Sequence, residues 1–172
     1  MVVLVGPPGS GKTTQAEILR KELGMTVITA DDLIRRNPQA FEKFRNPQIH
    51  GIEPRVDPAL NRLVDEALAS ADRSKGVVLA GYPAAKIHGD YIPTLLKKYG
   101  LNKPIVIHLR VPDDVVVKRL ENQNRPDLEQ ELKDYHREMD FAQDYFPQAD
   151  IRDVDGTMSV SEVAKEIRKQ LK

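Results

Sequence analysis

Short apolar runs recur along the chain, and the stretches between them carry apolar residues at helical spacing. The runs are rich in β-branched residues and predict strands at residues 2–5, 26–29, 77–80, 105–109 and 151–154. Strands that are apolar almost throughout are typical of parallel sheets with helices on both faces. We therefore expect a three-layer α/β fold built on a five-stranded parallel sheet.

Helix signals lie between the expected strands. One helix is expected after Asp57 and Pro58, because aspartate caps helix starts and proline suits the first turn. Its apolar positions recur every three or four residues: Leu60, Leu63, Val64, Ala67 and Leu68. Further helices are expected from Leu128 onwards and after Ser159, which forms a capping-box pattern with Glu162.

Residues 6–13, GPPGSGKT, follow the first expected strand and precede an expected helix at residues 14–23. They fit the phosphate-binding pattern G-x-x-x-x-G-K-[ST], in which glycines let backbone N–H groups turn toward an anion at a helix N-terminus. Lys12 is expected to bridge the β- and γ-phosphates of ATP, and the Thr13 hydroxyl to bind Mg²⁺. The expected nucleotide-binding residues of this segment are Gly6, Gly9, Ser10, Gly11, Lys12, Thr13 and Thr14.

This loop does not identify the acceptor of the phosphoryl group, because kinases, hydrolases and nucleotide sensors share it. In an open parallel sheet, ligands bind beyond the carboxyl ends of the strands. Residues just after Val5, Thr29, Ala80 and Leu109 are therefore expected to face the site and to decide the acceptor.

The composition excludes several classes of binding partner. The 172 residues fit one domain, residues 1–172, and 26 basic residues balance 26 acidic ones, so no broad basic field attracts nucleic acid or an anionic membrane. The lack of cysteine excludes disulfides and thiolate zinc sites. The apolar start MVVLV is far shorter than a signal peptide or a membrane span. We expect a soluble, cytoplasmic, monomeric protein that acts on a small molecule.

Three segments carry a family resemblance. Residues 6–15, GPPGSGKTTQ, are similar to G-x-P-G-x-G-K-G-T-Q; residues 29–35, TADDLIR, to S-T-G-D-L-L-R; and residues 81–83, GYP, to part of D-G-F-P-R. Together they resemble the adenylate kinase family of nucleoside monophosphate kinases, in order over most of the chain. The resemblance implies transfer of the γ-phosphoryl group of MgATP to a nucleoside monophosphate, AMP, whose phosphate Arg35 holds.

The later segments extend the resemblance. Residues 111–114 and 118–120 resemble the family's helix that leads to its lid, and residues 155–156 resemble its loop near the donor adenine. The resemblance implies that Arg119 lies against the donor base and that Arg125 is a catalytic arginine, the first residue of the family's R-x-D-D motif. It also implies an acceptor-binding insertion at about 31–70 and a very short lid at about 120–126.

The chain departs from the family pattern after the third expected strand. Ala80 and Ala84 replace an aspartate of the metal shell and an arginine that binds phosphate, and His88 replaces a glutamine that reads adenine. A carboxylate near the Mg²⁺ and a cationic clamp are therefore both missing from their family positions.

Two further positions depart from the family near the lid, where Gln123 and Glu131 stand at or near expected arginines. Arginines and metal at the transferring phosphoryl group are worth about 10³–10⁵ in rate, so the departures imply slow catalysis unless other cations substitute. The cations considered as substitutes are Arg36, Arg55 and Lys86.

Asp31 and Asp32 follow the second expected strand at its carboxyl end. Either residue could cap a helix, or, with Ala80 in place of an acid, Asp31 or Asp32 could hold a Mg²⁺-bound water, and Asp32 is assigned with Thr13 to the metal. An alcohol acceptor would also profit from a carboxylate that takes its proton. Two alternatives to the leading function therefore stay open: a small-molecule kinase that uses Asp32 as a base on an alcohol, and a nucleotide-binding module with weak catalysis.

The remaining polar residues give weaker signals. The four histidines show no metal-ligand spacing, and His108 is expected to pack within its strand rather than to bind a ligand. Residues 51–58 form either a plain connection or part of the site for the acceptor base, and the sequence does not separate these two readings.

Overall fold

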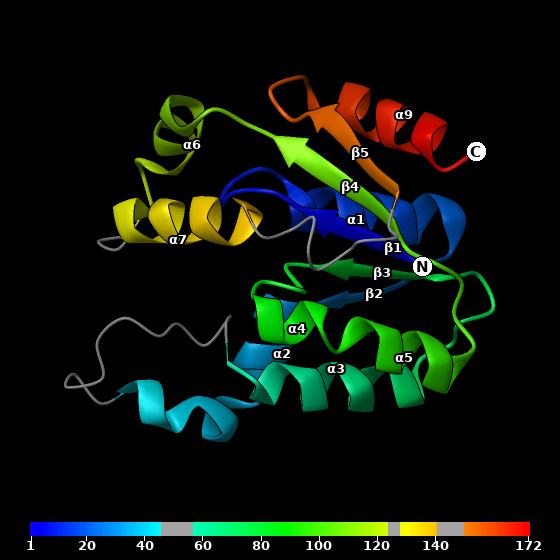
Figure 1. Cartoon of the computed structure of the whole chain (residues 1–172). Helices are drawn as coiled ribbons and strands as arrows, with labels where there is room; N and C mark the ends of the chain where they lie inside the picture. The colour runs from blue at the N-terminus through cyan, green and yellow to red at the C-terminus, as the bar shows by residue number, and fades with distance from the viewer. Residues whose placement is uncertain (46–56, 124–127, 141–149) are drawn as a thin grey trace.

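The computed structural model describes residues 1–45, 57–123, 128–140 and 150–172 (Figure 1). Its strands form one parallel sheet in the order β2-β3-β1-β4-β5, so the predicted five-stranded parallel sheet is confirmed. The strand bounds agree with the prediction to within one residue at each end: β1 Val2–Val5, β2 Thr26–Thr29, β3 Val77–Ala80, β4 Ile105–Arg110 and β5 Asp150–Asp155.

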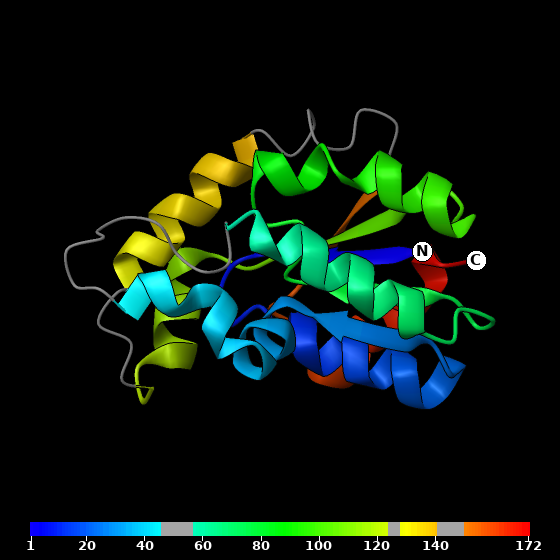
Figure 2. The ribbon, with the colours of Figure 1, turned by 90° about the horizontal axis from the view of Figure 1, so that it is seen from below.

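Helices cover both faces of the sheet, as the apolar strands predicted (Figures 1 and 2). Helices α1 (Lys12–Leu23) and α9 (Val160–Gln170) pack on one face, and α3 (Ala59–Ser70) and α5 (Ile92–Tyr99) pack on the other. The remaining helices of the described residues are α2 (Ala30–Arg36), η1 (Pro38–Arg45), α4 (Lys86–Gly89), α6 (Asp113–Leu120) and α7 (Leu128–Asp140).

The core is divided by the sheet into two apolar layers. Along β1, Val2 and Leu4 pack in the layer under α1 and α9, whereas Val3 and Val5 pack in the layer under α3 and α5. This alternation follows from strand geometry, in which successive side chains point to opposite faces. Each such buried side chain stabilises the fold by about 1.5–3 kcal/mol, so β1 contributes to both layers at once.

The helix starts follow the signals in the sequence. The Asp57 carboxylate accepts a hydrogen bond from the Ala59 amide at 2.7 Å, as a cap of α3 should. Ser159 and Glu162 form the predicted capping box of α9. Helix α1 begins at Lys12, two residues before the predicted start, because the helix takes up the end of the glycine-rich loop.

All five strands end at the same edge of the sheet. In Figure 1 the arrowheads point to the left, α6 and α7 lie beyond that edge, and both chain termini lie at the opposite end. The segments that follow the five strands therefore all begin at this carboxyl edge. In the described residues, no helix has the length and apolarity needed to cross a membrane.

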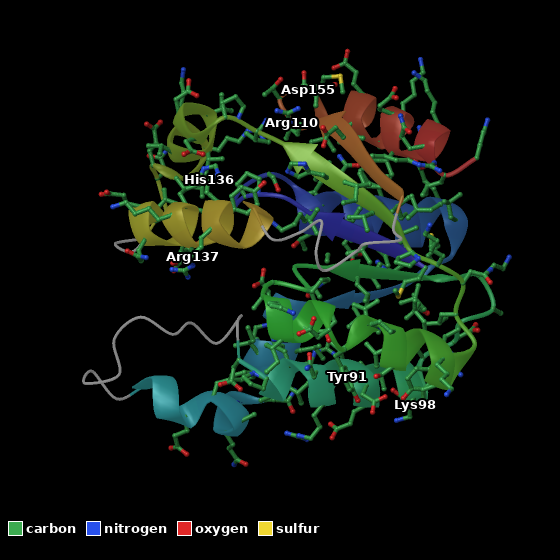
Figure 3. All side chains as sticks on the ribbon, viewed as in Figure 1. Tyr91, Lys98, Arg110, His136, Arg137 and Asp155 are labelled. Carbon is green, nitrogen blue, oxygen red and sulfur yellow. The ribbon has the colours of Figure 1, made fainter. Side chains whose placement is uncertain are left out.

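A polar cluster joins α3 to α5 on the outer side of the second layer. The Asp65 carboxylate accepts hydrogen bonds from Lys98 Nζ at 2.7 and 2.8 Å and from the Tyr99 hydroxyl at 2.5 Å. These bonds, that from Lys98 first, hold the pKa of Asp65 below its ordinary value. Figure 3 shows Lys98, on α5, away from the carboxyl edge, and Tyr91 just before the start of that helix. We therefore assign this cluster a role in stabilising the fold.

We expect Asp65→Asn to lower the free energy of unfolding at pH 7 by about 1 kcal/mol, because an amide accepts weaker hydrogen bonds than a carboxylate. Folding lowers the pKa of Asp65, so its contribution is present above its ordinary value near pH 4 and is lost as the pH falls through the lower folded value. Urea unfolding of wild type and variant at pH 7, 5 and 3 should show the difference shrinking in acid.

The matched control is Glu129→Gln, which removes an exposed ion pair with Lys133 on α7. Exposed pairs stabilise little, so this variant should follow the wild type at every pH. A stability difference for Asp65→Asn that is the same at pH 7 and pH 3 would show that the charge of Asp65 is not the stabilising feature.

Candidate functional site

The glycine-rich loop lies at the centre of the carboxyl edge, because it follows β1 and β1 is the middle strand of the sheet. Gly6, Gly9 and Gly11 have φ angles of +150°, +69° and +95°, which other residues rarely adopt. At Gly6 a Cβ atom would lie 2.7 Å from the Leu109 carbonyl oxygen. The loop thus needs glycine here both for its backbone angles and for its close contact with β4.

Lys12 lies across this loop. Its Nζ donates hydrogen bonds to the carbonyl oxygens of Gly6 at 2.8 Å and Pro7 at 2.7 Å, and it lies 3.4 Å from the hydroxyl of the buried Ser10. The ammonium group is therefore held beside the backbone that forms the predicted anion nest, next to the positive end of α1. The role of Lys12 in binding phosphates stays a prediction.

The first turn of α1 presents Thr13 and Thr14, and both residues are exposed. A Mg²⁺ ion that arrives with a nucleotide takes most of its six ligands from phosphate oxygens and water, so a single protein hydroxyl is a suitable further ligand. Thr13 offers such an oxygen beside the loop. Among the described residues no group of three or more carboxylate, histidine or cysteine side chains is placed to hold a metal without a nucleotide.

Arg119 connects the loop to the segment after β5. Its guanidinium donates to the Gly156 carbonyl at 2.8 Å and to the Gly9 carbonyl at 3.4 Å. A Cβ atom at Gly156 would lie 2.6 Å from Val111 Cγ2, so this close approach also needs glycine. The structure thus brings together Gly9, Arg119 and the residue 155–156 segment, which the sequence had placed on the side of the donor base.

The Asp155 carboxyl stabilises the segment after β5. It accepts hydrogen bonds from the Thr157 hydroxyl at 2.6 Å and the Thr157 amide at 2.8 Å. These bonds, with the positive charge of Arg119 nearby, hold the pKa of Asp155 below its ordinary value. Figure 3 shows Asp155 and Arg110 together at the ends of β5 and β4. Asp155 therefore stays ionised near Arg119 at neutral pH.

On the other side of the loop, α2 carries Asp32 and Arg35. The Thr29 hydroxyl caps α2 by accepting a hydrogen bond from the Asp32 amide at 3.0 Å. The Asp32 carboxylate accepts a hydrogen bond from Arg35 at 2.5 Å and lies 3.9 Å from a guanidinium nitrogen of Arg36. The two predicted catalytic residues of α2 are therefore partners, and this pairing favours an orienting role for Asp32.

Other positions from the sequence analysis contribute less to the site. Ala80 is buried at the end of β3, and Gln123 is exposed just beyond α6. Lys86, considered as a substitute cation, instead pairs with Asp90 at 2.8 Å. Arg55 and Arg125 lie outside the described residues, as does part of the expected lid and of the acceptor-binding insertion.

His88 does not face a ligand. Its side chain is 0% exposed, and its ring nitrogens contact backbone groups of Ala84 and Asp57. The resemblance had aligned His88 with a residue that reads a nucleobase, and the structure instead buries it behind the site.

Arg137 is a candidate that the sequence analysis missed. It lies on α7, pairs with Asp134 at 2.9 Å and keeps its side chain 59% exposed. Figure 3 shows Arg137 on the side of α7 that is turned toward α4 in this view. The family resemblance had pointed to the position of Glu131, which lies earlier on the same helix. The signal that could have found Arg137 is its place on a helix that follows the expected lid.

A histidine network holds α7 against the sheet. His108, on β4, bridges the Asp153 carboxylate at 2.8 Å and the Tyr135 hydroxyl at 2.8 Å. Burial raises the pKa of the Tyr135 phenol to about 12, so it stays a hydrogen-bond donor at neutral pH. His136 reaches Asp113 at 2.9 Å. His108 is thus packed, as predicted, and these contacts fix the helix that carries Arg137.

Comparisons with known proteins identify what this chain is similar to. The adenylate kinase family model matches residues 4–151. An adenylate kinase of Micrococcus luteus is 33% identical over 96% of this chain and 87% of its own length. An adenylate kinase of Mycolicibacterium vanbaalenii is 33% identical over 94% of this chain and 93% of its own length, and one of Mesorhizobium japonicum is 28% identical over 96% and 93%.

We expect Gly6→Ala to weaken MgATP binding at least tenfold, because the added Cβ would collide with the Leu109 carbonyl and displace the loop. The matched control is Gly100→Ala, at a φ of +60° with open space around the added atom and outside the loop. It should cost about 1 kcal/mol in unfolding free energy but leave MgATP binding unchanged. Calorimetric titration of both variants tests this, and wild-type affinity in Gly6→Ala would contradict the assigned site.

Proposed function

The chain belongs to the adenylate kinase family, and on that premise we propose that it transfers the γ-phosphoryl group of MgATP to a nucleoside monophosphate, with AMP as its acceptor. Membership makes the chain an ATP-dependent phosphotransferase. The observation that carries the proposal is Lys12, held across a loop of positive-φ glycines in the middle of the carboxyl edge.

On the donor side, the amides of residues 6–13 and the ammonium of Lys12 would hold the phosphates of ATP. Arg119 would lie beside the base, since it already joins Gly9 to Gly156. Thr13 would contribute a ligand to Mg²⁺, which neutralises charge on the transferring group when it is bound. Lys12 and Thr13 lie on α1 and Arg119 lies on α6, and the packing of these two helices in the apolar core determines where they lie.

On the acceptor side, Arg35 on α2 favours a phosphorylated substrate. A nucleoside monophosphate is already an anionic nucleophile and needs a cation rather than a base. Arg35 supplies that cation, and Asp32 orients it through their 2.5 Å contact. The Asp32 carboxylate already accepts a hydrogen bond from Arg35, and this contact counts against the alternative in which Asp32 takes the proton of an alcohol.

Arg137 supports efficient rather than weak catalysis. Ala80 and Ala84 contribute no charge, but the guanidinium of Arg137 is exposed on α7, which lies beyond the carboxyl edge (Figures 1 and 3). We include it among the cations that surround the transferring group, together with Arg125, which lies outside the described residues. An acceptor-binding insertion at about 31–70, a short lid at about 120–126, and a monomeric cytoplasmic protein remain part of the proposal.

The first test is the formation of ADP from MgATP with a panel of nucleoside monophosphates and with no acceptor. We expect turnover that depends on AMP and that falls at least a hundredfold in Lys12→Ala, because the variant loses the cation at the β- and γ-phosphates. Lys12→Ala also controls for contaminating kinases. If ADP forms slowly and equally with every acceptor and with none, the chain is not a nucleoside monophosphate kinase.

Arg35→Ala should raise the KM for AMP at least tenfold and leave the KM for MgATP within twofold, since the donor groups lie on other elements. Arg36→Ala is the matched control, because Arg36 is also exposed on α2 but lies farther from Asp32. Steady-state kinetics with each substrate varied in turn separates the two constants. Equal KM values for AMP in the wild type and Arg35→Ala would remove Arg35 from the acceptor site.

A further inference from the structure

A buried polar network lies behind the carboxyl end of β3, apart from the groups that hold the donor. Its centre is His88 on α4, which is 0% exposed. His88 Nε2 lies 2.9 Å from the Asp57 carbonyl oxygen, and His88 Nδ1 lies 3.3 Å from the Ala84 amide nitrogen. The imidazole is also stacked on the ring of Tyr82, with centroids 5.0 Å apart. Two separate segments thus meet at one side chain.

The hydrogen-bond partners determine the tautomer of His88. The Ala84 amide can only donate, so Nδ1 must accept, and the ring hydrogen of the neutral imidazole is then on Nε2. Nε2 therefore donates to the Asp57 carbonyl. An unpaired polar atom in such a buried position is strongly unfavourable, so few other side chains could satisfy both backbone groups at once.

A second pair of hydrogen bonds joins the same segments. The Tyr82 hydroxyl donates to Asn61 Oδ1 at 2.7 Å, and Asn61 Nδ2 donates to the Ile87 carbonyl at 3.1 Å. Asn61 lies in the first turn of α3, directly after the residues that Asp57 caps. The start of α3 is therefore tied to the segment of residues 82–88 through both His88 and Asn61.

This junction has a consequence for the proposed acceptor site. Helix α3 is where the chain returns from α2 and η1, the part that carries Arg35, and the residue 82–88 segment follows β3 beside the central strand. Resting on the function proposed above, we propose that His88 is a positioning residue for the acceptor nucleotide. It holds the start of α3, against which α2 packs, at a fixed distance from the carboxyl edge of β3, without touching the substrate.

The donor side does not depend on this junction. Lys12 contacts residues 6–10 and Arg119 contacts residues 9 and 156, whereas His88 contacts residues 57 and 84. Loss of His88 should therefore change the binding of AMP and leave the binding of MgATP almost unchanged. A merely structural residue would weaken both substrates together or neither.

The test uses His88→Ala, which removes both backbone contacts, and His88→Asn, whose side-chain oxygen can replace Nδ1 as acceptor of the Ala84 amide. We expect the Kd and KM for AMP to rise at least tenfold in His88→Ala and to recover partly in His88→Asn. The Kd for MgATP should stay within twofold of wild type in both. Calorimetric binding and steady-state kinetics supply the two constants independently.

The matched control is Tyr99→Phe, which removes a hydrogen bond of the Asp65 cluster that also joins α3 to its neighbours, but away from the carboxyl edge. It should lower stability without changing the binding of AMP or MgATP. If His88→Ala does not fold, Asn61→Ala takes its place, because it removes the second link between the same two segments. The same selective loss of AMP affinity is then expected.

The outcomes separate the two proposals. A wild-type chain that binds MgATP but shows neither AMP binding nor AMP-dependent turnover overturns the proposed function, and the positioning role with it. A wild-type chain that binds AMP, with His88→Ala binding it equally well, overturns only the positioning role. Parallel loss of both AMP and MgATP in His88→Ala, or an equal loss of AMP binding in Tyr99→Phe, also overturns it.

Discussion

The burial of β1 on both faces is the constraint on which the rest of the structure depends. Val3 and Leu4 are each 0% exposed, and their side chains enter different apolar layers. A strand buried in this way has to be central, and its parallel partners β3 and β4 end at the same edge. The glycine-rich loop that follows β1 is therefore in the middle of that edge, where segments from both halves of the sheet can reach it.

In the proposed function, the strand order separates the two substrates across this loop. Strands β4 and β5 lie on one side of β1 and lead to Arg119 and Gly156, whereas β3 and β2 lie on the other and lead to His88 and Arg35. Donor and acceptor groups are thus carried by different halves of one sheet. The central loop is the place where both halves meet, which suits an enzyme that brings two nucleotides together.

Local patterns predicted the strands and the loop, whereas tertiary contacts decided the rest. The five strands were predicted within a residue, because strands buried at every position, such as β1 and β3, leave a continuous apolar run in the sequence. The loop was found because its glycines and Lys12 act at fixed spacing. No local pattern could show that His88 would be buried or that Asp32 would pair with Arg35, since both depend on where side chains point after folding. Arg137 was missed for the same reason.

The hydrogen bonds of Arg119 restrict its side chain, and this restriction affects how the residue can bind a ligand. An arginine in water moves among many rotamers, and ordering its side chain costs about 2 kcal/mol. Here the hydrogen bonds to Gly9 and Gly156 order the guanidinium before any nucleotide arrives. The flat surface of the group is thereby preorganised for the base that the proposed function places on it. The conformational entropy of the Arg119 side chain is therefore lost when the chain folds rather than when a ligand binds.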